Sequence, residues 1–207
     1  MTSDEPVVWL PPAGEAAQDE IAAALTRVGS ILTPELTPPG GPVILEGPAL
    51  EVLAAISASG ADRGVLCGWG MGTMVALQVA AGFPERVSAL VLMTHHRFET
   101  RALLSVSEGV MGLLPVGTLQ RVGVRPRRIV ELLDRVRPVD FRLLAPQVSV
   151  PALVLVGEQD RANRGPSAAL AKALPQGRLV VVPGAGADWP AERPEDLAEL
   201  SARFLAG

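Results

Sequence analysis

Apolar positions in this chain occur either as short continuous runs or at helical spacing. The continuous runs predict strands, because a strand buried on both faces of a parallel sheet is apolar at almost every position. We expect strands at 6–10, 30–33, 65–67, 87–93, 152–156 and 179–182. The spaced positions between them predict helices at 21–28, 50–56, 71–81 and 168–174, and a last helix from Pro194 onward. This alternation predicts an α/β fold with a mostly parallel sheet and helices on both faces.

Two of these helices have distinctive patterns. Residues 71–81 are apolar on nearly every side, which is typical of a central helix that is covered on both sides. The last helix has Pro194 in its first turn beside Glu195 and Asp196, and carboxylates suit the positive end of a helix dipole. Both patterns favour the same layered architecture.

The regular alternation is interrupted between residues 97 and 147. Gly- and Pro-containing segments there surround one helical pattern near 129–136. We interpret 97–147 as a short helical lid inserted into a single domain that spans residues 1–207, because this length suits one domain better than two.

Composition and charge narrow the range of partners. The formal net charge is −4, and no basic stripe is interleaved with aromatic residues, so nucleic acid is not expected as the main partner. No apolar run reaches the roughly 18 to 20 residues that span a bilayer, so a membrane partner is not expected either. Cys67 is the single cysteine, and the acidic start has no signal-peptide pattern, which together predict a cytoplasmic location. No cofactor and no metal site is predicted.

Four segments carry motifs. Residues 68–72 read Gly-Trp-Gly-Met-Gly between a predicted strand and helix, and residues 10–14 read Leu-Pro-Pro-Ala-Gly after the first strand. Near the C-terminus, 150–160 is a strand followed by a turn that ends at Asp160, and 183–187 reads Pro-Gly-Ala-Gly-Ala. Taken together, these segments resemble the G-x-S-x-G nucleophile elbow, the oxyanion loop, the acid strand and the base loop of the α/β-hydrolase superfamily.

The resemblance extends from about residue 6 to residue 205 and implies the α/β-hydrolase fold. The family's usual first hairpin is missing, so the fold is expected to be reduced at its N-terminus. A sheet edge exposed in this way can be covered by another subunit, and a homodimer is therefore one expectation.

Matched residue by residue, the resemblance makes Asp160 the retained acid. Gly70 stands at the position of the nucleophilic serine, and Ala187 stands at that of the catalytic histidine. The backbone N–H groups of Ala13 and Met71 correspond to the oxyanion donors, and backbone donors survive the loss of side chains. Because the members of a triad act as one unit, the resemblance implies that acyl-serine chemistry is absent.

Glycine at position 70 has a physical explanation. A nucleophile elbow holds its central residue in a strained conformation that costs about 1–3 kcal/mol, and glycine adopts such conformations freely. Loss of the serine therefore relaxes the turn. Decay under selection for stability and deliberate emptying of the site both predict this residue.

His95 and His96 are the candidate catalytic side chains. They are the only histidines and follow directly on the strand at 87–93, and the carboxyl ends of parallel strands line the site in folds of this kind. One of them could act as general acid or base near neutral pH, with Asp160 as its partner. The alternative is that both lie at the hinge of the lid without a chemical role.

The three tryptophans lie in or beside motif segments, at Trp9, Trp69 and Trp189. With Gly70, Ala187 and Asp188, residues Trp69 and Trp189 are expected to line a pocket for an apolar small molecule. Ordinary core packing is the alternative for all three indoles, and a turn or helix-entry role is the alternative for Asp188. Cys67 is interpreted as a small core residue rather than a nucleophile.

A local excess of arginine lies between 121 and 142 in an otherwise acidic chain. Its ordinary interpretation is a solvated face of the lid. If it is functional, it would attract an anionic partner such as a coenzyme A ester or an acyl carrier protein.

Three functions remain open at this point. The first is a non-hydrolytic enzyme that promotes a cyclisation, elimination or isomerisation through His95 or His96, in secondary-metabolite biosynthesis. The second is a pseudo-hydrolase that binds a ligand or a partner protein without turnover. The third is residual ester or thioester hydrolysis by a bound water, for which no activating group is evident.

Overall fold

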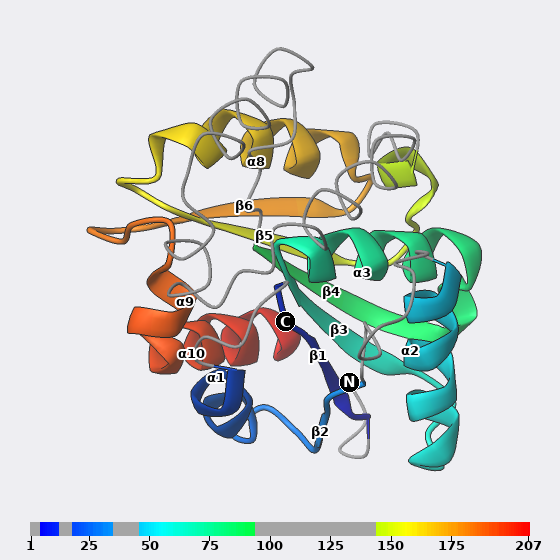
Figure 1. Ribbon diagram of the computed structural model, residues 1–207. Coiled ribbons are helices and arrows are strands. Elements are labelled where there is room, and N and C mark those ends of the chain that lie inside the picture. Colours follow the sequence, from blue (N-terminus) through cyan, green and yellow to red (C-terminus); the bar gives the residue numbers. More distant parts are fainter. Residues whose placement is uncertain (1–4, 13–17, 35–45, 94–143) are drawn as a thin grey trace, which may run out of the picture.

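The computed structural model describes residues 5–12, 18–34, 46–93 and 144–207 (Figure 1). Within this part of the chain six strands form one sheet: β1 Val7–Leu10, β2 Ile31–Leu32, β3 Gly64–Trp69, β4 Val87–Met93, β5 Ala152–Gly157 and β6 Gly177–Val182. Their order across the sheet is β2-β1-β3-β4-β5-β6, and every neighbouring pair is parallel. All six predicted strands are confirmed, although the strand expected at 30–33 is reduced to two residues.

Helices cover both faces of the sheet, as predicted. They are α1 Gln18–Leu25, α2 Glu46–Ala58, α3 Met71–Gly82, α8 Arg161–Ala173, α9 Trp189–Glu192 and α10 Pro194–Leu205, with short 3-10 turns η1 Pro84–Arg86 and η2 Ala145–Gln147. In Figure 1, α8, α3 and α2 follow the upper and right-hand side, and α9, α10 and α1 gather at the lower left.

Alternate residues of each strand feed two separate cores. Val8 and Leu10 of β1 pack in the cluster that includes α2, α3 and α8, whereas Val7 and Trp9 pack in the cluster that includes α1, α9 and α10. Helix α3 is buried along nearly its whole length, which confirms the central covered helix. The two-sided burial explains why the strands read as continuous apolar runs.

Several helix boundaries differ from the predictions, and the helix expected at 50–56 runs from Glu46 to Ala58. The helix expected at 168–174 begins seven residues earlier, at Arg161, because Asp160 caps it and its first half is too polar to show an apolar stripe. The helix expected at 21–28 ends at Leu25, and turn-type bonds such as Val28 N–H to the Leu25 carbonyl (2.8 Å) follow it. Short helix α9 was not predicted.

Other expectations lie wholly or partly outside the described residues. Most of the segment interpreted as a lid, Ala13, His95, His96 and the arginine-rich stretch are among them. The last residues of the segment interpreted as a lid, Ala145–Gln147, form η2, and Ala145 is buried in the core beside α3 and α8. Among the described helices, none combines the length and the apolar character that crossing a bilayer requires. The homodimer stays a prediction.

Candidate functional site

The turn between β3 and α3 consists of a single residue, Gly70. Its backbone has φ 58° and ψ −114°, a combination that residues with a side chain rarely adopt. The sharp strand-to-helix turn expected from the motif is therefore present. Glycine keeps that geometry without the conformational cost that a side chain would add.

Hydrogen bonds tie this turn to the end of the neighbouring strand. The Gly70 N–H donates to the Met93 carbonyl at 3.0 Å, which joins the turn to the last residue of β4. The Thr73 hydroxyl is fully buried and lies 3.0 Å from both the Gly68 and the Met93 carbonyl oxygens. Sequence reasoning missed Thr73, although a lone hydroxyl in the first turn of an apolar helix was a usable signal.

The two outer glycines of the motif allow close backbone packing. A Cβ atom on Gly72 would lie 1.9 Å from the Leu10 carbonyl oxygen, and one on Gly68 would lie 2.6 Å from the Gly72 backbone. The carboxyl end of β1 thus touches the start of α3, so the chain leaves β1 beside the turn. Met71 is the first residue of α3, a position whose N–H has no acceptor within its own helix.

Asp160 lies just beyond the carboxyl end of β5 and caps α8. Its side chain is 7 % exposed. One carboxylate oxygen accepts from the Asn163 backbone N–H at 3.2 Å, and the other accepts from the Asn163 side-chain amide at 2.6 Å. Its own N–H donates to the Gly157 carbonyl at 3.1 Å. The carboxylate is therefore held by the first turn of its own helix.

The loop after β6 is joined to the turn that carries Asp160. The Gln159 N–H donates to the Ala185 carbonyl at 2.9 Å, and the Gly184 N–H donates to the Glu158 carboxylate at 2.9 Å. A Cβ atom on Gly157 would lie 2.2 Å from the Gly186 carbonyl oxygen. The two loops that the resemblance assigns to the acid and the base are therefore packed backbone against backbone.

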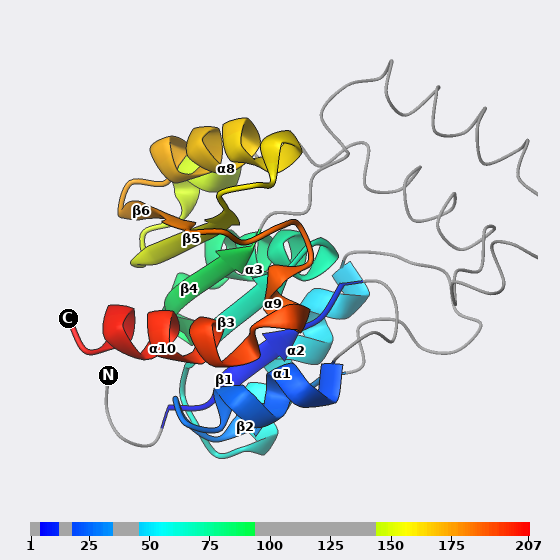
Figure 2. The ribbon, with the colours of Figure 1, turned by 90° about the vertical axis from the view of Figure 1, so that its left-hand side faces the viewer.

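This loop leads the chain back across the carboxyl ends of the strands. It leaves β6 at one edge of the sheet and enters α9, which contacts both α1 and α10 on the side of β1 (Figure 2). Ala187 and Asp188 are the last residues before α9. Ala187 is partly exposed, and Asp188 is exposed and makes no side-chain capping bond to α9.

All three tryptophans belong to the core cluster on the α1 and α10 face. Trp9 has no exposed surface, Trp189 has 2 % and Trp69 has 5 %. The Trp9 indole N–H has no hydrogen-bond partner in the described part of the chain. Core packing, the alternative interpretation, thus describes these side chains, and their role as walls of a ligand pocket stays a prediction.

Cys67 behaves as the sequence predicts for a core residue. It is buried beside Trp9 in the sheet register, and burial raises the pKa of its thiol far above the usual range. A thiol that stays protonated is a poor nucleophile. In the described residues no group of three or more His, Cys, Asp or Glu side chains is placed to hold a metal ion.

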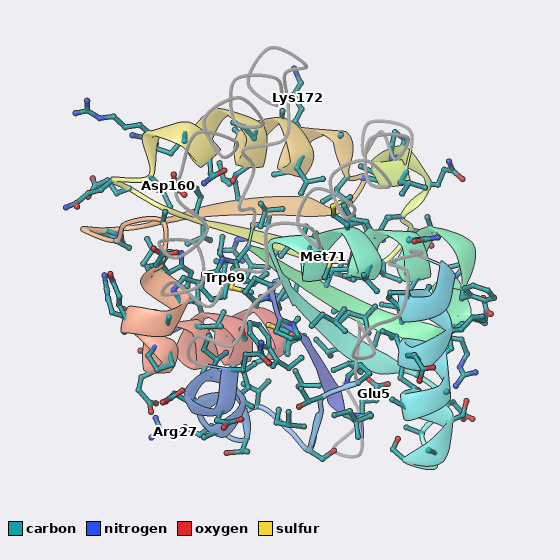
Figure 3. All side chains as sticks on the ribbon, viewed as in Figure 1. Glu5, Arg27, Trp69, Met71, Asp160 and Lys172 are labelled. Carbon is teal, nitrogen blue, oxygen red and sulfur yellow. The ribbon has the colours of Figure 1, made fainter. Side chains whose placement is uncertain are left out.

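The predicted site residues are thus only partly brought together. Figure 3 shows Trp69 and Asp160 on the same side of the view, far from Glu5, which precedes β1 at the amino edge of the sheet. Gly70 is joined to β4 through its bond to Met93, and the turn that carries Asp160 is joined through Gln159 to the loop that ends at Ala187. His95, His96 and Ala13 lie outside the described residues.

Comparison with known proteins identifies the fold. No protein-family model matches the chain, and no curated protein matches it in sequence. Solved structures do match. The enol-lactonase from Burkholderia xenovorans LB400 is similar with a TM-score of 0.74 and 20% identity over 99% of this chain and 92% of that chain. The 2-hydroxy-6-oxo-6-phenylhexa-2,4-dienoate hydrolase from Rhodococcus sp. strain RHA1 matches with a TM-score of 0.73 and 20% identity, covering 99% of this chain and 91% of that chain.

A thermophilic esterase from Thermogutta terrifontis is also similar, with a TM-score of 0.72 and 20% identity over 99% of this chain and 90% of that chain. The chain therefore has the α/β-hydrolase fold. At this identity the likeness concerns the fold and not the residues of a site.

Proposed function

We propose that this protein uses the α/β-hydrolase fold without serine-hydrolase chemistry. It binds a small, mainly apolar molecule at the carboxyl edge of the sheet, where Gly70 and Ala187 take the positions of the nucleophile and the base. The observation that carries the proposal is the backbone of Gly70, whose φ of 58° and ψ of −114° belong to a sharp elbow with no side chain at its apex.

The backbone donors supply the polar part of the proposed site. The Met71 N–H lies at the start of the 12-residue helix α3, where the helix dipole favours a partial negative charge. A carbonyl oxygen of the bound molecule would accept from it, and from the Ala13 N–H in the loop that follows β1. The matched enzymes include a lactonase and an esterase, which favours a carbonyl-containing ligand.

Turnover in this site would be a proton transfer that leads to cyclisation, elimination or isomerisation. The chain between Met93 and His95 spans at most about 7 Å, and the Met93 carbonyl is bonded to the Gly70 N–H. This short connection supports an imidazole of His95 or His96 as the general acid or base. Asp160 would assist it, since a carboxylate offers about four lone-pair positions.

Binding without turnover is the second candidate. It is favoured by Asp160, because each of its two oxygens already accepts a hydrogen bond from Asn163 and an imidazole would have to share one of them. On this proposal the ligand or partner occupies the same edge of the sheet, and no histidine is needed for its binding.

The first experiment tests the absence of serine chemistry. A fluorophosphonate probe should leave the protein unlabelled, and p-nitrophenyl butyrate should not be hydrolysed above the background rate. Stoichiometric labelling of any serine at this edge would overturn the proposal.

A second experiment tests the binding site and separates the two candidates. A thermal-shift screen with small lactones and short acyl esters should find stabilising molecules, and Ala187→Phe should weaken their binding at least tenfold. The matched control is Val181→Phe on the exposed side of β6, which should leave binding unchanged. If a ligand is converted, loss of turnover in His95→Gln or His96→Gln with unchanged affinity supports the acid–base candidate. Turnover that survives both changes removes it.

A further inference from the structure

The carboxylate of Asp160 is buried and is served by a neighbour in its own helix. Asp160 is 7 % exposed and Asn163 is 4 % exposed. Asn163 donates to one oxygen through its backbone N–H and to the other through its side-chain amide, at 3.2 Å and 2.6 Å. The second of these bonds is the shorter one, and it is independent of the ordinary helix cap.

A triad acid has a different arrangement. One of its oxygens must face the ring N–H of the histidine, because that bond sets the orientation and the tautomer of the imidazole. A buried carboxylate oxygen that loses such a donor is costly to leave unsatisfied. The side chain of Ala187 has no hydrogen-bond donor, so another donor has to bond to the buried carboxylate of Asp160.

We propose that Asn163 replaces the missing histidine as the hydrogen-bond partner of Asp160 and occupies the carboxylate oxygen that a triad histidine would use. The inference rests on the proposed function, because it takes residues 70, 160 and 187 as the three positions of the former triad. Asn163 is a positioning residue here. It acts on the site through Asp160 and touches no substrate.

The local structure explains why Asn163 can do this. It is the third residue of α8, so its side chain points back toward the capping residue. The Asp160 N–H already donates to the Gly157 carbonyl, so it is not the partner of the Asn163 side chain. The Asn163 amide N–H donates to the Asp160 carboxylate instead. The pair is therefore formed within one turn of helix and does not depend on the loop at 183–187.

The consequence is that two substitutions alone should rebuild a triad of low reactivity. In the variant Gly70→Ser with Ala187→His, the new imidazole meets a carboxylate oxygen that is already occupied. Adding Asn163→Ala frees that oxygen for the ring N–H. The triple variant should react with a fluorophosphonate probe roughly tenfold faster than the double variant.

A matched control separates this effect from general loosening of α8. Ser167 is also fully buried and lies one turn further along the same helix. The double variant that carries Ser167→Ala instead of Asn163→Ala should keep the slow labelling rate. Equal rates in the double variant and in the variant with Asn163→Ala would overturn the inference.

Thermal unfolding gives a readout that does not depend on catalysis. Asn163→Ala in the otherwise unchanged protein leaves an oxygen of Asp160 without its amide donor, and the melting temperature should fall by about 3–8 °C. With Ala187→His in place, the imidazole takes over the bond, so the same substitution should cost less than half as much. An equal loss in the two backgrounds would contradict the proposed exchange of partners.

The two measurements distinguish the inference from the function on which it rests. Labelling in the double variant shows that the three positions share one site, whether or not Asn163 matters. If neither the double nor the triple variant is labelled and the two thermal losses are equal, the three positions do not form one site, and both proposals fail together. If the double variant is labelled as fast as the triple variant, only the role of Asn163 fails.

Discussion

The elbow around Gly70 and the region around Asp160 are held together in different ways. Backbone geometry defines the first, and hydrogen bonds to a side chain define the second. At the elbow the backbone forms a sharp strand-to-helix turn. The Thr73 hydroxyl bonds to it, and Leu10 approaches Gly72 closely. On the side of Asp160 the loops are also joined, and the carboxylate is bonded to Asn163 of the helix that it caps.

The difference shows which features the fold itself needs. A glycine against a neighbouring carbonyl is required by sterics whatever reaction the site performs, so Gly68 and Gly72 remain although residue 70 has no side chain. A buried carboxylate needs a hydrogen-bond donor, and at Asp160 the Asn163 amide supplies one.

The strongest test is Gly72→Ala at the elbow. The new Cβ would lie 1.9 Å from the Leu10 carbonyl oxygen, so β1 and α3 would have to move apart. We expect a loss of at least ~3 kcal/mol in the free energy of unfolding, measured by urea denaturation. Gly82→Ala is the control, because a Cβ there meets nothing within 4 Å and should leave stability unchanged or slightly higher. A loss below ~1 kcal/mol for Gly72→Ala would show that the elbow is not tightly packed.

The corresponding change on the side of Asp160 is Gly157→Ala. Its Cβ would lie 2.2 Å from the Gly186 carbonyl oxygen and would push the two loops apart. Because a loop yields more readily than a strand and a helix, we expect a smaller loss of about 2 kcal/mol. Gly165→Ala within α8 is the control, since a Cβ there has open space and should stabilise the helix by about 0.5–1 kcal/mol. If Gly157→Ala costs more than Gly72→Ala, the ranking of the two regions is reversed.

Gly70→Ala tests the conformation of the elbow itself. An alanine would have to adopt a φ near 58°, which should cost about 1–2 kcal/mol in the free energy of unfolding. Gly70→Ser should cost the same, because the penalty arises from the Cβ atom that both residues have. A neutral effect of both substitutions would mean that the turn can leave this geometry.

The smallest effect is expected at Glu158, whose carboxylate accepts from the Gly184 N–H. Glu158→Ala should make the Gly184 amide exchange with solvent several-fold faster, while the Gln159 amide, which is bonded to the Ala185 carbonyl, should be unchanged. Glu158→Gln keeps an acceptor oxygen and should protect Gly184 as the native residue does. Hydrogen exchange followed by NMR would measure the two amides in the native protein and in both variants. Faster exchange at both amides would indicate that the loops separate as a unit.

Most of the fold was predictable from the sequence because a strand that is buried on both faces appears as a continuous apolar run. The inner strands β1, β3, β4 and β5 are buried at nearly every position, and the runs at 87–93 and 152–156 match β4 and β5 to within one residue. The start of α8 was predicted too late. Its first half contains the polar Asn163 and Gly165, and capping by the Asp160 side chain rather than an apolar stripe decides where the helix begins.

Less of the candidate site could be predicted. The motif correctly indicated the sharp turn at Gly70, because a backbone conformation of this kind favours glycine. The bond between Asn163 and Asp160 was not predicted, because many polar residues follow Asp160 and nothing in the spacing says which of them turns back to it. The buried hydroxyl of Thr73 was missed although it is the single hydroxyl of a mainly apolar helix.

The packing of α10 against α1 has a consequence for how the protein is made. The two helices come from opposite ends of the described chain, yet together they cover the face of the sheet that holds Trp9. During synthesis on the ribosome, β1 and α1 emerge well before residues 194–205, which complete the cover of this face. Contacts between such distant segments form slowly, and an uncovered apolar surface attracts other nascent chains. The demand on cellular chaperones should therefore come from this half of the molecule rather than from the side of α3.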